Sequence, residues 1–264
     1  QGWEVVPTDA HDLDITDSQV VRRELARQRP EVVINAAAAT RVDELESDQD
    51  GALRVNGLGP RNLAVACRRL GMKLIHLSTD YVFDGAKAEP YVEWDATGPL
   101  SVYGRSKLLG EEWVRQQCPD HFIVRTAWLY GLPGPNFVTA ILARGRSLTP
   151  AGELKVVQDQ RGTPTSALAL APQLLALAAT EAFGTYHATC QGETTWYEFA
   201  GLILAAAGIP VRLTPCTTEE FPRPAPRPAN SVLANRLLQV AGLDLMPTWQ
   251  VAFQEFWAAY RDRL

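Results

Sequence analysis

The residues best suited to chemistry are a tyrosine and a lysine four positions apart, Tyr103 and Lys107. Positions i and i+4 of a helix share one face, so the phenol and the ammonium can reach the same point. A neighbouring cation favours a phenolate, which predicts that the pKa of Tyr103 lies below its usual value of about 10. An exposed helix also carries such a pair by chance, so the surrounding sequence has to support the chemistry.

Two further segments place suitable side chains after apolar runs. Thr79 and Asp80 follow the run at 73–78, and a hydroxyl at the end of a strand is well placed to bind a substrate carbonyl oxygen. The alternative for this segment is a turn formed by Ser, Thr and Asp side chains. Trp128 follows the run at 121–126, where it would line a cleft or belong to the core. Open α/β sheets bind ligands at the carboxyl ends of their strands, so both segments point to one cleft.

The elements that must position these residues alternate along the chain. Short apolar runs rich in β-branched residues are followed by helical patterns, which is typical of parallel βαβ units. Gly71 is expected to end one of the helices as its C-cap. The predicted strands are 4–7, 32–34, 73–78 and 121–126, and the predicted helices are 18–28, 56–70, 103–116, 195–207 and 249–263.

Composition excludes several classes of protein. The 264 residues carry a net charge of −5, and the basic residues are scattered, which argues against nucleic-acid binding. The four cysteines form no C-x-x-C pair, so neither a disulfide framework nor a metal site is expected, and reduced thiols indicate the cytoplasm. No apolar run approaches the roughly 18 residues that span a bilayer, and no secretory signal is visible.

Several segments together are similar to the extended short-chain dehydrogenases, and within them resemble the dTDP-4-dehydrorhamnose reductases. The resemblance covers essentially the whole chain. It rests on NAAA at 35–38, STDYVFDG at 78–85, VYGRSKLLGE at 102–111, RTAWLYG at 125–131, DQRGTPT at 159–165 and RPANS at 227–231.

The resemblance implies an α/β fold, a Rossmann-like doubly wound parallel sheet with a smaller C-terminal substrate-binding lobe. Residues 1–131 would form the dinucleotide-binding domain. Residues 132–264 would form mainly the substrate-binding lobe, interleaved with the last elements of the main sheet. Proline and glycine clusters at 131–135 and 222–228 interrupt the regular pattern in this second part.

The resemblance also implies a reaction, the reduction of dTDP-4-dehydro-L-rhamnose to dTDP-L-rhamnose with NADPH or NADH. Tyr103 would be the proton donor, and Thr79 would hold the keto oxygen. Lys107 would bind the nicotinamide ribose and tune the phenol. The nucleotide-sugar substrate would contact Thr79, Asp80 and Trp128, and more weakly supported contacts are Asn136, Phe137 and Arg161.

The cofactor would contact small and acidic residues near the start of the chain. An aspartate such as Asp9 accepts hydrogen bonds from a ribose 2′-OH and repels a 2′-phosphate. We therefore expect NADH to be used at least as readily as NADPH. The implied cofactor contacts are Asp9, Asp14, Ile15, Ala37, Ala38 and Ala39, together with Tyr103 and Lys107.

One part of the family pattern is absent. No G-x-x-G-x-x-G turn occurs, although such a turn normally holds the pyrophosphate at a helix N-terminus. Residues 1–6 resemble the entry to a second strand, so the first strand, turn and helix are expected upstream. The chain as written would then bind cofactor poorly and turn over no substrate. Ala39 also stands where the family usually has histidine.

Two other interpretations stay open. A nucleotide-sugar epimerase, or a reductase of another keto-sugar, shares the tyrosine and lysine. A non-catalytic regulatory subunit, like that of methionine adenosyltransferase, also resembles these reductases and keeps the pair. A homodimer is compatible with the resemblance, which leaves the oligomeric state undecided.

Overall fold

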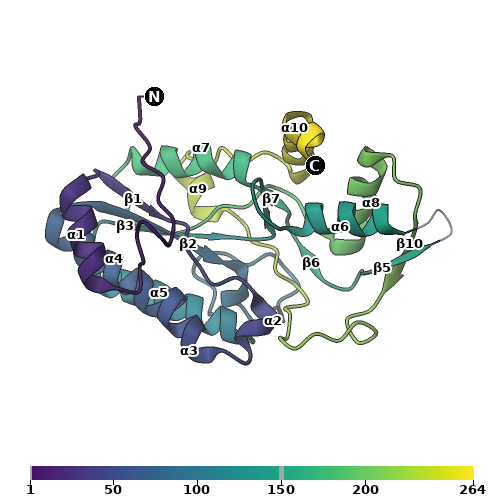
Figure 1. The fold of residues 1–264 in the computed structure, drawn as a ribbon, viewed down its shortest axis with the longest axis horizontal. Coiled ribbons are helices and arrows are strands. Elements are labelled where there is room, and N and C mark those ends of the chain that lie inside the picture. Colours follow the sequence, from purple (N-terminus) through teal and green to yellow (C-terminus); the bar gives the residue numbers. More distant parts are fainter. Residues whose placement is uncertain (1, 149–151) are drawn as a thin grey trace.

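The centre of the protein is a parallel sheet. The computed structural model describes residues 2–148 and 152–264 (Figure 1). Four strands in the order β1-β2-β3-β8 form this sheet, and all neighbouring pairs are parallel. The strands are β1 (Val32–Asn35), β2 (Lys73–Thr79), β3 (His121–Thr126) and β8 (Gly184–His187).

Helices cover both faces of this sheet (Figure 1). Leu74 and Ile123 point to one face, where they pack with residues of α1 (Ser18–Gln28) and α4 (Gly59–Leu70). On the opposite face, Ile75, Phe122 and Val124 pack with leucines of α7 (Ala167–Ala178). Successive strand residues thus enter different cores, as expected for strands buried on both sides. The predicted doubly wound fold is confirmed.

The first two turns of α5 (Val102–Gln117) carry the predicted catalytic pair. Ser101 caps this helix, and its hydroxyl accepts a hydrogen bond from the backbone N–H of Gly104 at 3.1 Å. A Cβ at Gly104 would lie 2.2 Å from the carbonyl oxygen of Tyr81, so only glycine permits this approach. The start of α5 is therefore held against the segment that follows β2.

A second lobe occupies the right-hand side of Figure 1. It contains α6 (Phe137–Ser147), α8 (Trp196–Ala207) and the parallel pair β5 (Glu153–Val157) with β10 (Arg212–Cys216). Two small pairs join β4 (Leu129–Tyr130) to β7 (Thr165–Ser166) and β6 (Arg161–Gly162) to β9 (Thr194–Thr195). The remaining helices are α2 (Val42–Leu45), α3 (Gln49–Ala52), α9 (Arg236–Val240) and α10 (Trp249–Tyr260).

Some predicted elements were wrong at their ends or altogether. Residues 4–7 form no strand, and Val5 and Val6 are 73% and 59% exposed. A strand needs a hydrogen-bonded neighbour, and no described segment pairs with these residues. The helix predicted at 56–70 is preceded by a π-helical turn at Leu53–Leu58, and α4 starts only at Gly59. Its predicted end is confirmed, since Gly71 adopts a φ of 68° as the C-cap.

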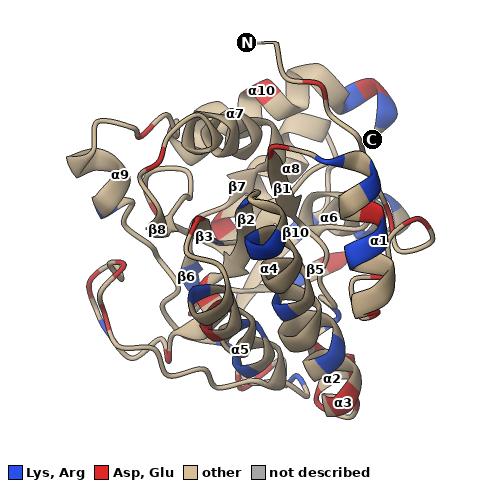
Figure 2. Cartoon of the chain, turned by 90° about the vertical axis from the view of Figure 1, so that its left-hand side faces the viewer, with Lys and Arg blue, Asp and Glu red and all other residues tan. Residues whose placement is uncertain are grey.

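The surface mixes both signs of charge. Figure 2 shows basic and acidic residues side by side on the helices that face the viewer, and the pairs Arg22-Arg23 and Arg68-Arg69 are exposed on α1 and α4. Within residues 2–148 and 152–264, no helix is long and apolar enough to cross a membrane.

Candidate active site

The predicted catalytic residues meet at the carboxyl edge of the sheet. β2 and β3 end side by side at Thr79 and Thr126. Tyr103 lies in the first turn of α5, and its ring meets the ring of Tyr81 edge to face, with 5.6 Å between centroids. Lys107 is buried one helical turn further, where its ammonium donates to the carbonyl oxygen of Leu77 at 2.6 Å. The i, i+4 geometry therefore brings both side chains to the end of β2.

Burial, rather than charge, controls the protonation of this pair. Burial raises the pKa of Tyr103 to about 12, against the smaller opposing effect of the Thr79 hydroxyl. Burial also lowers the pKa of Lys107 to about 8, although the Glu111 carboxylate partly opposes this. The expectation that the lysine lowers the pKa of the phenol was wrong. Because the ammonium bonds to Leu77, desolvation dominates, and Tyr103 is a neutral phenol at neutral pH.

The segment after β2 holds a buried carboxyl group. The Thr79 hydroxyl donates to an Asp80 carboxylate oxygen at 2.9 Å and accepts from the backbone N–H of Tyr81 at 3.2 Å. Burial raises the pKa of Asp80 to about 6. Oδ2 of Asp80 has no hydrogen-bond partner in the described part of the chain. A buried polar atom without a partner is costly, and such atoms are often found at binding sites.

A buried ion network lies beneath the pair. Glu111 is fully buried and accepts from the Ser78 hydroxyl at 2.6 Å and from two nitrogens of Arg125 at 2.9 and 2.8 Å. Arg115 donates to the same carboxylate at 2.5 Å. The sequence interpretation assigned no role to Glu111. Its spacing was the available signal, because it lies four residues beyond Lys107 on the same helical face.

The small residues after β1 lie next to Tyr103, the predicted proton donor. Ala39 and Tyr103 pack against one buried cluster formed by Leu45, Ala52 and Val102. Ala37 donates its backbone N–H to the Asn35 side chain at 3.2 Å, and Ala37 and Ala38 keep some exposed surface. The Asn35 side chain thus holds Ala37 in place, and Ala37 and Ala38 stay accessible at the surface.

Asn56 links this loop to α5. Its side chain accepts from the backbone N–H of Ala39 at 2.8 Å and donates to the Ala39 carbonyl oxygen and the Ser106 hydroxyl, each at 3.0 Å. Sequence reasoning missed this residue, because nothing in its neighbours predicts contacts 17 and 50 positions away.

The other predicted cofactor residues lie before α1. Asp9 is exposed, and its carboxylate accepts from the backbone N–H groups of His11 and Asp12 at 2.8 and 3.3 Å. Asp14 is likewise exposed and bonds to Thr16. Ile15 is buried, and its carbonyl oxygen accepts from the Asn62 side chain at 2.9 Å. The contacts of Asp9 and Asp14 are local turns, whereas Asn62 ties Ile15 to α4, and no hydrogen bond joins the segment to Tyr103 in the residues described.

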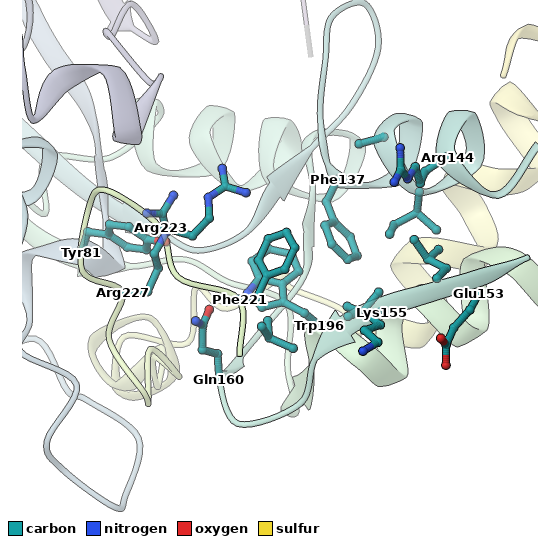
Figure 3. A pocket seen from close by; sticks show the side chains of 15 residues that line it. Tyr81, Phe137, Arg144, Glu153, Lys155, Gln160, Trp196, Phe221, Arg223 and Arg227 are labelled. Carbon is teal, nitrogen blue, oxygen red and sulfur yellow. The ribbon is translucent and has the colours of Figure 1, made fainter. Parts of the chain in front are cut away.

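A cavity of about 820 Å³ opens between the sheet and the second lobe (Figure 3). Tyr81 lines one end of it, which places Tyr103 beside the cavity. The predicted substrate residue Phe137 lines the middle together with Trp196. Trp128 stacks on Trp196 with 3.4 Å between ring centroids.

Trp128 also has a strained backbone. Its φ is 46°, in the left-handed region that a tryptophan rarely adopts. A Cβ at Gly162 would lie 2.2 Å from the indole ring, so the ring rests directly on that glycine. Only a glycine at position 162 therefore leaves room for the indole of Trp128 in this position.

Two other predicted substrate residues have structural partners instead. Asn136 caps α6 and donates to the Gly131 carbonyl oxygen at 2.7 Å. The Arg161 side chain is 42% exposed and pairs with Glu193 at 2.6 Å. Neither residue lines the described cavity.

Comparisons with known proteins identify the family. The family described as the RmlD substrate binding domain matches residues 1–262. The chain belongs to this family. A dTDP-4-dehydrorhamnose reductase of Streptomyces griseus is 46% identical, over 95% of this chain and 84% of its own length. A dTDP-4-keto-6-deoxy-D-glucose reductase of Streptomyces niveus is 42% identical, over 95% of this chain and 87% of its own length.

A solved structure supports the same assignment. The dTDP-4-dehydrorhamnose reductase of Bacillus anthracis, in complex with NADP, superposes with a TM-score of 0.94. It is 38% identical, and the match covers 97% of this chain and 90% of that one. The predicted resemblance to the dTDP-4-dehydrorhamnose reductases and the predicted fold are thereby confirmed.

Proposed function

We propose that this RmlD-family protein reduces dTDP-4-dehydro-L-rhamnose to dTDP-L-rhamnose with NADPH or NADH. The observation that carries the proposal is the meeting of Thr79, Tyr103 and Lys107 at the end of β2, beside a cavity of about 820 Å³. That volume suits a small-molecule ligand of this kind.

In this proposal Tyr103 protonates the oxygen at C4 of the sugar. Its raised pKa, about 12, keeps the phenol protonated at neutral pH, which is the form that a proton donor needs. The Thr79 hydroxyl orients the same oxygen after turning away from Asp80. Phe137 contacts the substrate at the cavity wall, Asp80 and Trp128 contact it from the segments that follow β2 and β3, and Asn136 and Arg161 act through the segments that they hold.

The residues present fit a dinucleotide beside this site. The uncovered loop Ala37, Ala38 and Ala39 leaves room for a backbone contact, and it reaches the same cluster as Tyr103. A bound nicotinamide supplies the hydride. Lys107 binds the nicotinamide ribose, and Asp9, Asp14 and Ile15 contact the adenosine half.

The domain assignment follows from these roles. Residues 1–131 bind the dinucleotide, and residues 132–264 bind mainly substrate, although β8 returns to the main sheet. We place the reaction in the cytoplasm. A homodimer is the assembly that we propose to test by sedimentation.

The test replaces one hydroxyl. In the full-length protein, Tyr103→Phe is expected to reduce kcat by on the order of 10²–10⁴, the usual contribution of a positioned general acid. NADPH oxidation is followed optically with dTDP-4-dehydro-L-rhamnose, and Tyr260→Phe on α10 is the matched control. If Tyr103→Phe keeps more than a tenth of the wild-type rate, Tyr103 is not the proton donor.

A second candidate comes from the relative named for dTDP-4-keto-6-deoxy-D-glucose reduction. The same site would accept another 4-keto sugar on the same nucleotide. A panel of dTDP-linked keto-sugars separates the two by kcat/KM. A wild-type protein that oxidises NADPH with none of them would instead favour a non-catalytic subunit.

A further inference from the structure

The cavity carries more positive charge than its proposed sugar requires. Its wall includes the cations Arg144, Lys155, Arg223 and Arg227 and one carboxylate, that of Glu153. A neutral keto-sugar gives no reason for this excess. A nucleotide sugar does, because its diphosphate carries two negative charges.

The charges and the aromatic rings follow one another along the cavity (Figure 3). Arg223 and Arg227 lie at the end beside Tyr81. Phe221, Trp196 and Phe137 lie in the middle, and Arg144, Lys155 and Glu153 lie at the far end. The guanidinium of Arg227 lies against the Tyr81 side chain, and the Tyr81 ring touches that of Tyr103.

This order matches the chemical order of a nucleotide sugar. C1 and C4 lie on opposite sides of a hexose ring, so a sugar with C4 at Tyr103 directs its diphosphate away from that tyrosine. The next charged groups in that direction are Arg227 and Arg223. The aromatic residues beyond them offer flat surfaces for a base.

Both guanidinium groups are already held by one carboxylate, that of Asp43 on α2. Nε of Arg223 donates to Oδ2 at 3.0 Å, and the Arg227 guanidinium donates to Oδ1. The backbone N–H of Ala225 also donates to Oδ1, at 3.2 Å. Burial raises the pKa of Asp43, but these donors outweigh it and hold that pKa well below its usual range. An arginine has five N–H donors, so each keeps others for a second anion.

Resting on the proposed function, we propose that Arg223 and Arg227 bind the diphosphate of the nucleotide sugar, and that Asp43 positions both guanidinium groups for it. Two fixed guanidinium groups suit a diphosphate, because each can donate a pair of hydrogen bonds to phosphate oxygens. Because Asp43 already holds the two long side chains in place, they lose little further conformational entropy when the diphosphate binds.

The experiment measures binding and needs no turnover. Dissociation constants for dTDP and for thymidine are measured by calorimetry, with and without saturating NADPH. Arg223→Gln and Arg227→Gln should each raise the dissociation constant of dTDP by about 10- to 100-fold, the contribution of a charge-assisted hydrogen bond. The dissociation constant of thymidine should stay unchanged. Asp43→Asn should raise the dissociation constant of dTDP by about threefold or more, the contribution of a partly exposed ion pair. Arg144→Gln, at the far end of the cavity, is the matched control. It should leave the ratio of the dTDP and thymidine dissociation constants unchanged.

Several results would overturn the assignment. These are a wild-type protein that does not bind dTDP, arginine variants that bind it normally, or a ratio that changes only in Arg144→Gln. Tighter dTDP binding by Asp43→Asn would show that the carboxylate competes with the diphosphate. Arg227→Lys, which keeps the charge, should recover part of the loss, and this separates recognition from misfolding. A protein that binds dTDP in this way but oxidises no NADPH contradicts the proposed reaction and leaves this subsite standing.

Discussion

Asp80→Asn is expected to stabilise the protein, although Asp80 lies in the proposed site. The Asp80 carboxyl group is 2% exposed, and one of its oxygens has no partner among the described residues. Burial raises its pKa from 3.8 to about 6. The folded state therefore holds a carboxylate at neutral pH that would be better solvated in the unfolded chain.

The magnitude follows from the two pKa values. A group whose pKa is higher in the folded state contributes stability below its unfolded pKa, and that contribution is lost as the pH rises through the folded pKa. The pKa of Asp80 rises from 3.8 to about 6 on folding, so its ionisation at pH 7 lowers the free energy of unfolding by about 3 kcal/mol. At pH 4.5 the cost is only about 1 kcal/mol. An asparagine avoids it at both values.

The assay is thermal unfolding of both proteins across pH 4.5–8. At pH 7 the Tm of Asp80→Asn should lie roughly 5–10 °C above that of the wild type, and the gap should narrow at pH 4.5. Asp84→Asn is the matched control, because a hydrogen bond from Tyr91 lowers the pKa of Asp84. Its Tm should fall by a similar amount across this range, because a carboxylate whose pKa is lowered from 3.8 contributes its stability at every pH above that value. A gap for Asp80→Asn that is negative, or independent of pH, would refute the reasoning.

Three further predictions concern the same site. The kcat/KM of the wild type should fall above pH about 8, as Lys107 loses its proton, and a flat profile to pH 9.5 would contradict this. Gly162→Ala should raise KM and cost about 1–3 kcal/mol of stability in denaturant titrations, because its Cβ would strike Trp128, and an unchanged KM would argue against it. Arg125→Met should cost about 3–5 kcal/mol by leaving buried Glu111 short of a partner, and a loss below 1 kcal/mol would show that Arg115 suffices.

The sequence predicted the centre of the fold and of the site well, for physical reasons. β2 and β3 each contain a short apolar stretch and are largely buried, so their ends were visible, and Thr79 ends β2 while Trp128 follows the end of β3. The spacing of Tyr103 and Lys107 supported a helix at 103–116, within one residue of α5 at each end. Local patterns were sufficient where a single element positions the residue.

Residues that act across the chain were not predicted. Residues 4–7 have the composition of a strand, but pairing decides strand formation, and no described segment pairs with them. Asn56 joins the loop at Ala39 to α5, and Arg223 reaches Asp43 across 180 positions. The proline-rich segment around 222–228 looked only like an interruption. No periodicity reports such contacts, because they depend on where two loops meet.

The protonation of the site shows most clearly why the sequence was insufficient. From the sequence, Tyr103 and Lys107 were an isolated pair, and Coulomb attraction predicted a lowered pKa for the phenol. In the fold Lys107 is buried and Tyr103 is partly buried, and this desolvation acts on the two groups in opposite directions: it raises the pKa of the phenol and lowers the pKa of the ammonium. The result favours the acid form of Tyr103 that a carbonyl reduction uses. Burial depends on the packing of α5 against β2, so it becomes visible only once the elements are assembled.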